Sequence, residues 1–427
     1  MITILLILLF TFLVLFGAPL FVIMGGIALI GFYLSYNNDF SILSIVVGEI
    51  YKIAGNPIFM TIPLFTFAGY LMAESKTSER VVRLAKALFG WLPGGIGIIT
   101  LLVCAFFTIF TGVSGVTIIA VGGLLYPILK KEGYPENFNL GILTSSGSLG
   151  LLFPPALPLI VYGIVAEINI DKLFLAGILP GILLMFFLGT YSMYNAFKIK
   201  APRYKFDLKE LGKATVGALW EIPIPIIIFV GIYSGFFTAS EASAIIALYV
   251  LFIEVVIYKD LHIIKDVPRV IRESMVLVGA IFIIIGVALG LTNLCIDQKV
   301  PDIMFSLIYK FIKSKYTFLI LLNIFLLIVG CLLDMFSAIM VVVAIIKPIA
   351  VQYGVDPIHL GILFISNLEI GYIMPPVGLN LFISSFRFNQ PILKLYKAAI
   401  PFIIVLGLGL IIITYVPSLT LFLVGPH

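Results

Sequence analysis

The chain has 427 residues, of which 62% are hydrophobic and only 11% are charged. Soluble globular proteins carry about 25% charged residues, so this composition predicts a protein that crosses a lipid bilayer several times. The net charge of +5 does not indicate a nucleic-acid partner, because lysine and arginine in membrane proteins mark the cytoplasmic loops.

Apolar stretches of about 20 residues, the length that crosses a hydrocarbon core, begin at the N-terminus. Residues 2–35 have no basic residue ahead of the apolar run, which predicts a retained span and not a cleaved signal peptide. This span is either one tilted helix or two short ones. Residues 42–73 predict the second span. In residues 75–91, basic and apolar side chains alternate at helical spacing, which predicts an amphipathic arm at the membrane surface.

Residues 93–129 are apolar around a polar centre, TGVSG, at residues 111–115. This pattern fits two ordinary spans joined by a tight turn. It also fits a re-entrant hairpin whose tip stops within the membrane. Each arm has only about 15 to 18 residues, which is short for a full crossing and therefore favours the hairpin.

The stretch TSSGSLGLLFPPALP, residues 144–158, interrupts the next apolar segment, residues 139–165. The two adjacent prolines remove two amide donors, and nearby glycines weaken the turn, so we expect a broken helix. Unwound backbone at membrane depth is tolerated only where it is buried in protein or lines a cavity. The break is therefore a candidate ligand site.

A second copy of this stretch, LGILFISNLEIGYIMPPVGLN at residues 360–380, lies in an apolar segment at 358–386. The remaining predicted elements are spans at 173–197, 216–236, 239–258 and 274–297, an amphipathic stretch at 299–315, a second hairpin at 316–350 centred on 330–338, and a last span at 397–423. We therefore predict an all-α polytopic membrane protein with two re-entrant hairpins and two broken helices.

The two halves of the chain repeat each other at an offset of 221 residues. The corresponding pairs are Pro127 and Pro348, Gly150 and Gly371, Pro154 and Pro375, and Pro155 and Pro376. We predict a first repeat over residues 1–200, a linker and connecting span over 201–238, and a second repeat over 239–427.

With both hairpins re-entrant and the N-terminus inside, one side of the membrane holds 19 of the 26 basic residues. This asymmetry obeys the positive-inside rule and places the N-terminus in the cytoplasm and the C-terminus in the periplasm. The hairpins then enter from opposite sides, so the repeats are inverted. Inverted repeats with broken helices are typical of secondary transporters, and we expect the elevator type seen in the ion-transporter superfamily.

Polar residues gather at the breaks and at the hairpin centres. A sodium ion takes about five or six hard oxygens, which hydroxyls and unwound backbone carbonyls supply. The candidates in the first half are Thr111, Ser114, Thr144, Ser145, Ser146 and Ser148, with Gly112, Gly147 and Gly150 allowing close approach of the backbone. The alternative is that these small residues only pack helices together.

The candidates in the second half are Asp334, Ser337, Ser366, Asn367, Glu369 and Asn380. An acidic side chain at membrane depth costs a few kcal/mol, so Asp334 and Glu369 are functional candidates. The alternative for both is a neutral, hydrogen-bonded carboxyl group that clamps a hairpin.

Motifs for nucleotide binding and catalysis are missing from the sequence. It lacks G-x-x-x-x-G-K-[ST], so we do not expect ATP to be handled. It also lacks H-E-x-x-H and paired aspartates at an interface, so we do not expect a membrane enzyme or a cofactor.

Four long stretches resemble the large membrane subunit of tripartite ATP-independent periplasmic (TRAP) transporters, the DctM-like family. They are PLFTFAGYLMAESKTSERVVRLAKALFGWLPGGIG, FFTIFTGVSGVTIIAVGGLLYPILKKEGYP, LGLLFPPALPLIVYG and LLDMFSAIMVVVAIIKPIAVQYGVDPIHLGILFISNLEIGYIMPPVGLNLF. The resemblance implies a bacterial inner-membrane permease that imports an organic anion with sodium, such as a dicarboxylate, sugar acid or keto acid. It implies two partners, a soluble periplasmic binding protein and a small four-helix membrane subunit on a separate polypeptide.

The family pattern implies two sodium sites and a substrate site. The first sodium site is Gly112, Ser114, Ser145, Ser146, Gly147, Ser148 and Gly150. The second is Asp334, Ser337, Ser366, Asn367, Glu369 and Gly371. The substrate contacts are Ser148, Pro154, Pro155, Pro375, Pro376 and Asn380. Val113, Val116 and Ala156 stand where the family often has hydroxyls, so these hydroxyl ligands are lost here, while ligation by backbone carbonyls at the hairpin tip is expected to remain.

A stand-alone secondary carboxylate carrier of the wider ion-transporter class remains the alternative function. It shares the repeat organisation and differs in needing no binding protein.

Overall fold

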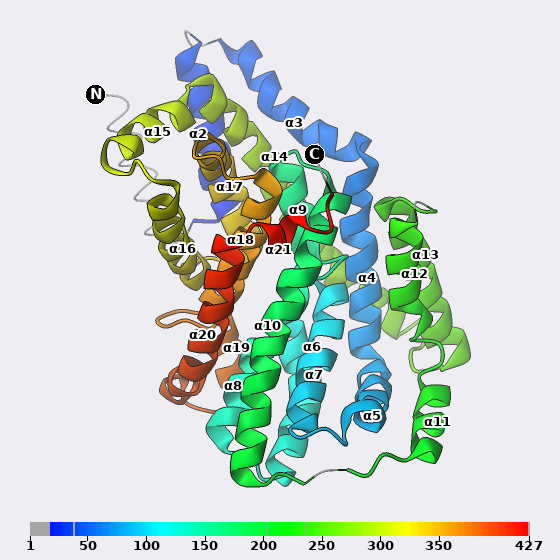
Figure 1. Cartoon of the computed structure of the whole chain (residues 1–427). Helices are drawn as coiled ribbons and strands as arrows, with labels where there is room; N and C mark the ends of the chain where they lie inside the picture. Colours follow the sequence, from blue (N-terminus) through cyan, green and yellow to red (C-terminus); the bar gives the residue numbers. More distant parts are fainter. Residues whose placement is uncertain (1–17, 37–38, 203, 235, 426–427) are drawn as a thin grey trace.

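The structure is a computed structural model that describes residues 18–36, 39–202, 204–234 and 236–425. All regular elements within these ranges are helices (Figure 1). The predicted span at residues 2–35 lies partly outside them. Its described part is α2 (Leu20–Ser35), which begins directly after Pro19.

The predicted single span at residues 42–73 is wrong, because the structure divides it in two. The elements are η1 (Phe40–Leu43), α3 (Ser44–Gly55), η2 (Pro57–Met60) and α4 (Thr61–Glu74). Asn56 has extended backbone angles, and its side-chain oxygen accepts from the Ile58 amide at 3.0 Å. Since Pro57 cannot donate a backbone hydrogen bond, the chain restarts as a new helix.

The first hairpin is confirmed. The predicted amphipathic arm is helix α5 (Thr77–Phe89). The hairpin that follows it consists of α6 (Gly95–Thr111) and α7 (Ser114–Lys131). Only Gly112 and Val113 separate α6 from α7. Gly112 has a left-handed φ of 64°, which glycine adopts without the steric cost of a Cβ atom. The arms have 17 and 18 residues, or about 26 Å of helix, which is less than a full crossing.

The first broken helix follows the hairpin. Its parts are α8 (Glu136–Ser146), the short turn η3 (Leu149–Leu152) and α9 (Leu157–Val165), and the following span is α10 (Ile170–Ile199). The helix axis bends by 48° at the break. The Pro154-Pro155 bond in the break is cis.

The connecting region contains α11 (Leu208–Gly217), α12 (Pro223–Tyr233), α13 (Ala239–Phe252), which continues as the π-helical turn η4 (Ile253–Ile257), and α14 (Asp266–Asp297). The predicted span at 216–236 is wrong, because α12 has only 11 residues. It is shortened where Glu221 joins a buried ion cluster and Pro223 starts a new helix.

The second half contains α15 (Val300–Phe311), the hairpin α16 (Lys315–Leu332) and α17 (Met335–Gln352), the broken helix α18 (Pro357–Gly371) and α19 (Leu379–Phe388), then α20 (Ile392–Tyr415) and α21 (Ser418–Leu421). Adding 221 to the bounds of α7 gives those of α17, and adding it to the start of α8 gives the start of α18. The two halves are therefore built alike.

The halves run in opposite directions (Figure 1). The arm α5 lies at the end of the molecule opposite α15, so the two hairpins enter from opposite ends. In the first broken helix α8 lies below α9, whereas in the second α18 lies above α19. In the described residues, eight helices pass a test of length and composition for crossing a membrane, or nine if the bent pair α8–α9 counts as one span. Three of the eight, α7, α16 and α17, are 18-residue helices of the two hairpins. The fold is an all-helical polytopic membrane protein with inverted repeats.

Arg80 on α5 holds a buried ion cluster that ties the arm to the connecting region. Its guanidinium pairs with Glu221, with Glu254 at 3.1 Å and with Asp260 at 2.6 Å. It also lies 3.7 Å from the centre of the Tyr258 ring. Burial and then the hydrogen bond to Glu221 raise the pKa of the Tyr258 phenol, so the phenol donates to that carboxylate at 2.7 Å. We call these five residues the Arg80 cluster.

We predict that Arg80→Ala destabilises the protein by about 3 kcal/mol, because it leaves buried carboxylates without their cation. Thermal unfolding of the purified protein in detergent measures this as a lower melting temperature. Arg83→Ala is the matched control on the same helix, since the Arg83–Glu210 pair is exposed and contributes little. Equal melting temperatures for the two variants would show that the cluster does not anchor the arm.

Candidate functional site

Each hairpin lies directly against the break in the neighbouring helix. In the first half, a Cβ atom on Gly150 would lie 2.4 Å from the carbonyl oxygen of Ala105 and 2.7 Å from the amide of Ile109. In the second half, a Cβ atom on Gly371 would lie 2.7 Å from the Cα of Gly330. Position 330 is the repeat counterpart of position 109. The two glycines therefore make the same close backbone approach to the first helix of each hairpin.

The first hairpin and the first break also share a polar contact. The hydroxyl of Thr108 on α6 donates to the carbonyl of Gly147 at 2.7 Å and is paired with the hydroxyl of Thr117 on α7. At the tip, a Cβ atom on Gly112 would lie 2.4 Å from the Leu157 side chain at the start of α9. Gly112 therefore allows the hairpin tip to approach the start of α9 closely, as predicted for this glycine.

The four serines of the first predicted sodium site are all buried, but their hydroxyls have different partners. Ser145 donates to the Gly141 carbonyl at 2.8 Å, and Ser148 lies 3.4 Å from the Ser145 carbonyl. Ser146 has no oxygen or nitrogen partner within the described residues, and the Cys104 thiol within its reach is only a weak hydrogen-bonding group.

The second half holds three further buried oxygens without a hydrogen-bond partner in the described chain. They are Ser366 Oγ, Asn367 Oδ1 and Glu369 Oε1, all on the last two turns of α18. The Asn367 amide nitrogen is satisfied, since it donates to the Leu363 carbonyl and to Asn323, each at 2.8 Å. Only the oxygen end of this side chain is left over.

One pair of these oxygens without partners occupies equivalent positions in the two repeats. Ser146 and Asn367 are 221 residues apart; Ser146 is the last residue of α8, and Asn367 lies one turn before the end of α18. A buried polar atom without a partner costs free energy comparable to a lost hydrogen bond, so such atoms call for an ion or water. Hard oxygens beside an unwound helix are the ligands that sodium prefers, and the residues present therefore fit this ion.

Asp334 and Ser337 form the cap of the second hairpin. Asp334 precedes α17, and its carboxylate accepts from the Ser337 amide at 3.1 Å. The carboxylate is exposed, whereas Ser337 is buried. The membrane-depth cost that singled out Asp334 in the sequence therefore applies more strongly to Glu369, which is 2% exposed.

The predicted substrate contacts differ in accessibility. Pro154, Pro155 and Ser148 are buried, whereas Pro375 and Pro376 are exposed. Asn380 is 0% exposed, and both ends of its side chain are hydrogen-bonded inside the protein. In this conformation the prolines of the second break are exposed, whereas those of the first are buried.

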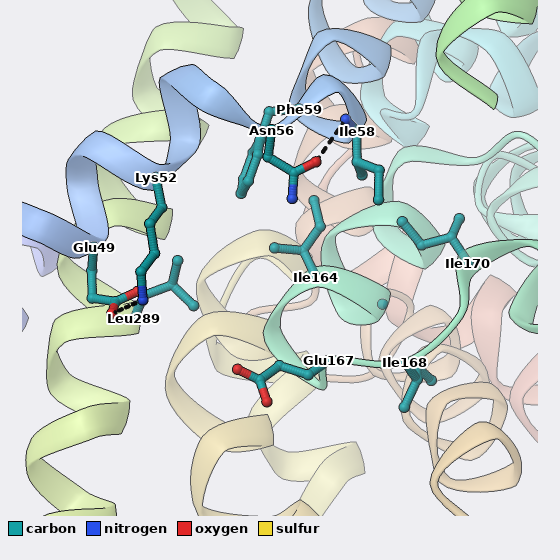
Figure 2. Close-up of a pocket in the computed structure, with 11 residues that line it drawn as sticks. Glu49, Lys52, Asn56, Ile58, Phe59, Ile164, Glu167, Ile168, Ile170 and Leu289 are labelled. Carbon is teal, nitrogen blue, oxygen red and sulfur yellow. Dashed lines mark hydrogen bonds and ion pairs between the residues drawn. The ribbon is translucent and has the colours of Figure 1, made fainter. Parts of the chain in front are cut away.

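A separate cavity of about 280 Å³ lies between α3, α14 and the turn after α9 (Figure 2). Lys52 pairs with Glu49 at 2.5 Å on one wall, and Glu167 lies on the other. Two carboxylates against one ammonium group make this cavity unfavourable for an anion. The sequence offered no signal for it, because its walls come from distant segments.

Comparison with known proteins supports the fold. The crystal structure of the Alcanivorax borkumensis YdaH transporter aligns with a TM-score of 0.68 and covers 92% of this chain and 91% of that chain. The sequences are only 13% identical, so the similarity concerns the fold alone.

Sequence relatives cover nearly the whole chain. The C4-dicarboxylate TRAP transporter large permease proteins DctM are 34% identical over 374 residues in Pseudomonas aeruginosa and 32% identical over 422 residues in Vibrio cholerae. They cover 87% and 94% of this chain, and the matches take in 87% and 92% of those proteins. The 2,3-diketo-L-gulonate TRAP transporter large permease protein YiaN of Escherichia coli is 29% identical, over 84% of this chain and 85% of its own.

These relatives are transporter permeases and not enzymes. A family model described as the DctM component of tripartite ATP-independent periplasmic transporters matches residues 6–419. The chain therefore belongs to the DctM family, the large permeases of TRAP transporters.

Proposed function

We propose that this permease imports organic anions together with sodium and receives them from a periplasmic binding protein. The observation that carries the proposal is the pair of equivalent buried oxygens, at Ser146 and Asn367, left without partners where the two helices break. A cation between each hairpin and its break would satisfy them. The proposed sodium ligands remain the residues named from the sequence. The alternative is that these residues only pack the helices together and bind no ion.

The substrate proposal rests on the relatives. Those named above transport C4-dicarboxylates and 2,3-diketo-L-gulonate according to their names. We infer a carboxylate of this size range, bound at the exposed second break around Pro375 and Pro376. Helix α19 begins directly after this break, and the positive end of its helix dipole favours an anion there.

We also propose the partners, orientation and movement. A small four-helix membrane subunit and a binding protein complete the transporter in the bacterial inner membrane. The basic helices α5 and α11 lie at one end of the molecule, which supports a cytoplasmic position for that end (Figure 1). The cytoplasmic N-terminus and periplasmic C-terminus remain proposals made from the distribution of basic residues along the sequence. The repeats over 1–200 and 239–427 move in the elevator manner.

Uptake into proteoliposomes tests the proposal. We expect the complete transporter, with its small subunit and binding protein, to take up labelled dicarboxylate only when sodium is present outside. Replacing sodium with choline, or omitting the binding protein, should each abolish uptake. Uptake that persists without the binding protein would instead identify a stand-alone carrier, and uptake that persists in choline would refute sodium coupling.

Ser146→Ala tests the first ion site. We expect the sodium concentration for half-maximal uptake to rise about tenfold, since a contact to a charged group contributes roughly 1.5–3 kcal/mol. Ser192→Ala is the matched control, because Ser192 on α10 is a buried serine whose hydroxyl also lacks a partner but lies beside Gly97, away from both breaks. An equal sodium response in both variants would favour the packing role.

A further inference from the structure

Asn380 lies where the second break meets the first half of the chain. It sits in the first turn of α19 and is completely buried. Its side-chain nitrogen donates to the carbonyl of Thr144 at 3.1 Å, and its side-chain oxygen accepts from the hydroxyl of Ser114 at 2.6 Å. Ser114 begins α7 at the tip of the first hairpin, and Thr144 lies on the last turns of α8. One side chain of the second repeat thus joins two parts of the first predicted sodium site.

The same face of α19 makes a second contact. Ser384 lies one turn after Asn380, is also completely buried, and its hydroxyl is hydrogen-bonded to that of Thr144 at 2.8 Å. The repeat counterparts of Asn380 and Ser384 are Leu159 and Gly163, whose side chains cannot form hydrogen bonds. At these two positions, both within the described residues, the first broken helix therefore makes no equivalent side-chain hydrogen bond to the second half, and the contact made by Asn380 is not a consequence of the repeat symmetry.

The loop before Asn380 is held by the second hairpin. The Gly378 amide donates to the Cys331 carbonyl at 3.1 Å, and the Met335 amide donates to the Tyr372 phenol. The Asn380 amide in turn donates to the Tyr372 carbonyl at 3.1 Å. The loop that carries the exposed prolines is therefore hydrogen-bonded to the tip of the second hairpin. Through Asn380 it is also connected to Ser114 at the tip of the first hairpin.

We propose that Asn380 is a positioning residue that couples the two sodium sites, and is not a substrate ligand. This inference rests on the proposed sodium-coupled function. A serine hydroxyl that donates its single proton to Asn380 presents its lone pairs elsewhere, which is the orientation a cation requires. Sodium at the first site therefore fixes Ser114 and Asn380, and with them the loop that contacts Cys331 and Met335, on either side of Asp334 at the tip of the second hairpin.

The test is the sodium dependence of uptake by the complete transporter in proteoliposomes. Wild type is expected to respond to sodium with a Hill coefficient above 1. In Asn380→Ala the half-maximal sodium concentration should rise by about fivefold or more and the Hill coefficient should fall to about 1, with the substrate KM unchanged at saturating sodium. Ser384→Ala removes the second contact and should shift both values less, in the same direction.

Ser385→Ala is the control on the same helix, because the Ser385 hydroxyl donates only to the nearby Gln390 carbonyl at 2.6 Å. An Asn380→Ala variant with the wild-type Hill coefficient and sodium response would overturn the coupling role. So would a raised substrate KM with an unchanged sodium response, which would make Asn380 a substrate ligand. If Asn380→Ala fails to fold, a wild-type response in Ser384→Ala overturns the proposal instead. Sodium-independent uptake by wild type would refute the proposed function itself and is recognised without any variant.

Discussion

Unwound backbone inside a membrane has no water to bind, and this constraint explains how the two halves are built. At each break the chain loses helical hydrogen bonds, so the freed groups need partners from the protein itself. The hairpin supplies that cover, with its first helix near enough that a Cβ atom on Gly150 or Gly371 would collide with its backbone. Hairpin, break and glycine therefore form one unit that appears twice.

The shared frame carries different chemistry in its two copies. Val113 in the first half corresponds to Asp334 in the second, Ser146 to Asn367 and Ser148 to Glu369. The first site is therefore built from neutral hydroxyls and carbonyls, whereas the second adds carboxyl and amide oxygens. Under the proposed sodium-coupled function, two sites with unequal charge would bind the ion with unequal affinity, and the contact made by Asn380 would link their occupancies.

The local sequence predicted the hairpins and broken helices well and the long-range contacts poorly. The apolar runs, the two Pro-Pro breaks and the offset of 221 residues are visible in the chain, and hairpins and broken helices followed from them. The division at Asn56 and Pro57 was missed although Asn-Pro is itself a turn signal. The Arg80 cluster was missed because its carboxylates lie between 141 and 180 residues away. Glu221 and Glu254 stand within predicted spans, but nothing in the sequence pairs them with Arg80. Likewise, the burial of Asn380 depends on the packing of α19 against the first half.

The difference between the two Pro-Pro breaks gives the inverted repeat its functional meaning. Pro154 and Pro155 are buried while Pro375 and Pro376 are exposed, although their local sequences correspond. The two breaks correspond in sequence but differ in exposure, so this conformation is asymmetric: it exposes the second break and buries the first. Under the proposed transport function, the opposite conformation arises when the two repeats exchange conformations, so that the first break becomes exposed and the second becomes buried. Under the same proposal, alternating access follows from the inverted repeat, and bound sodium would set when the exchange occurs.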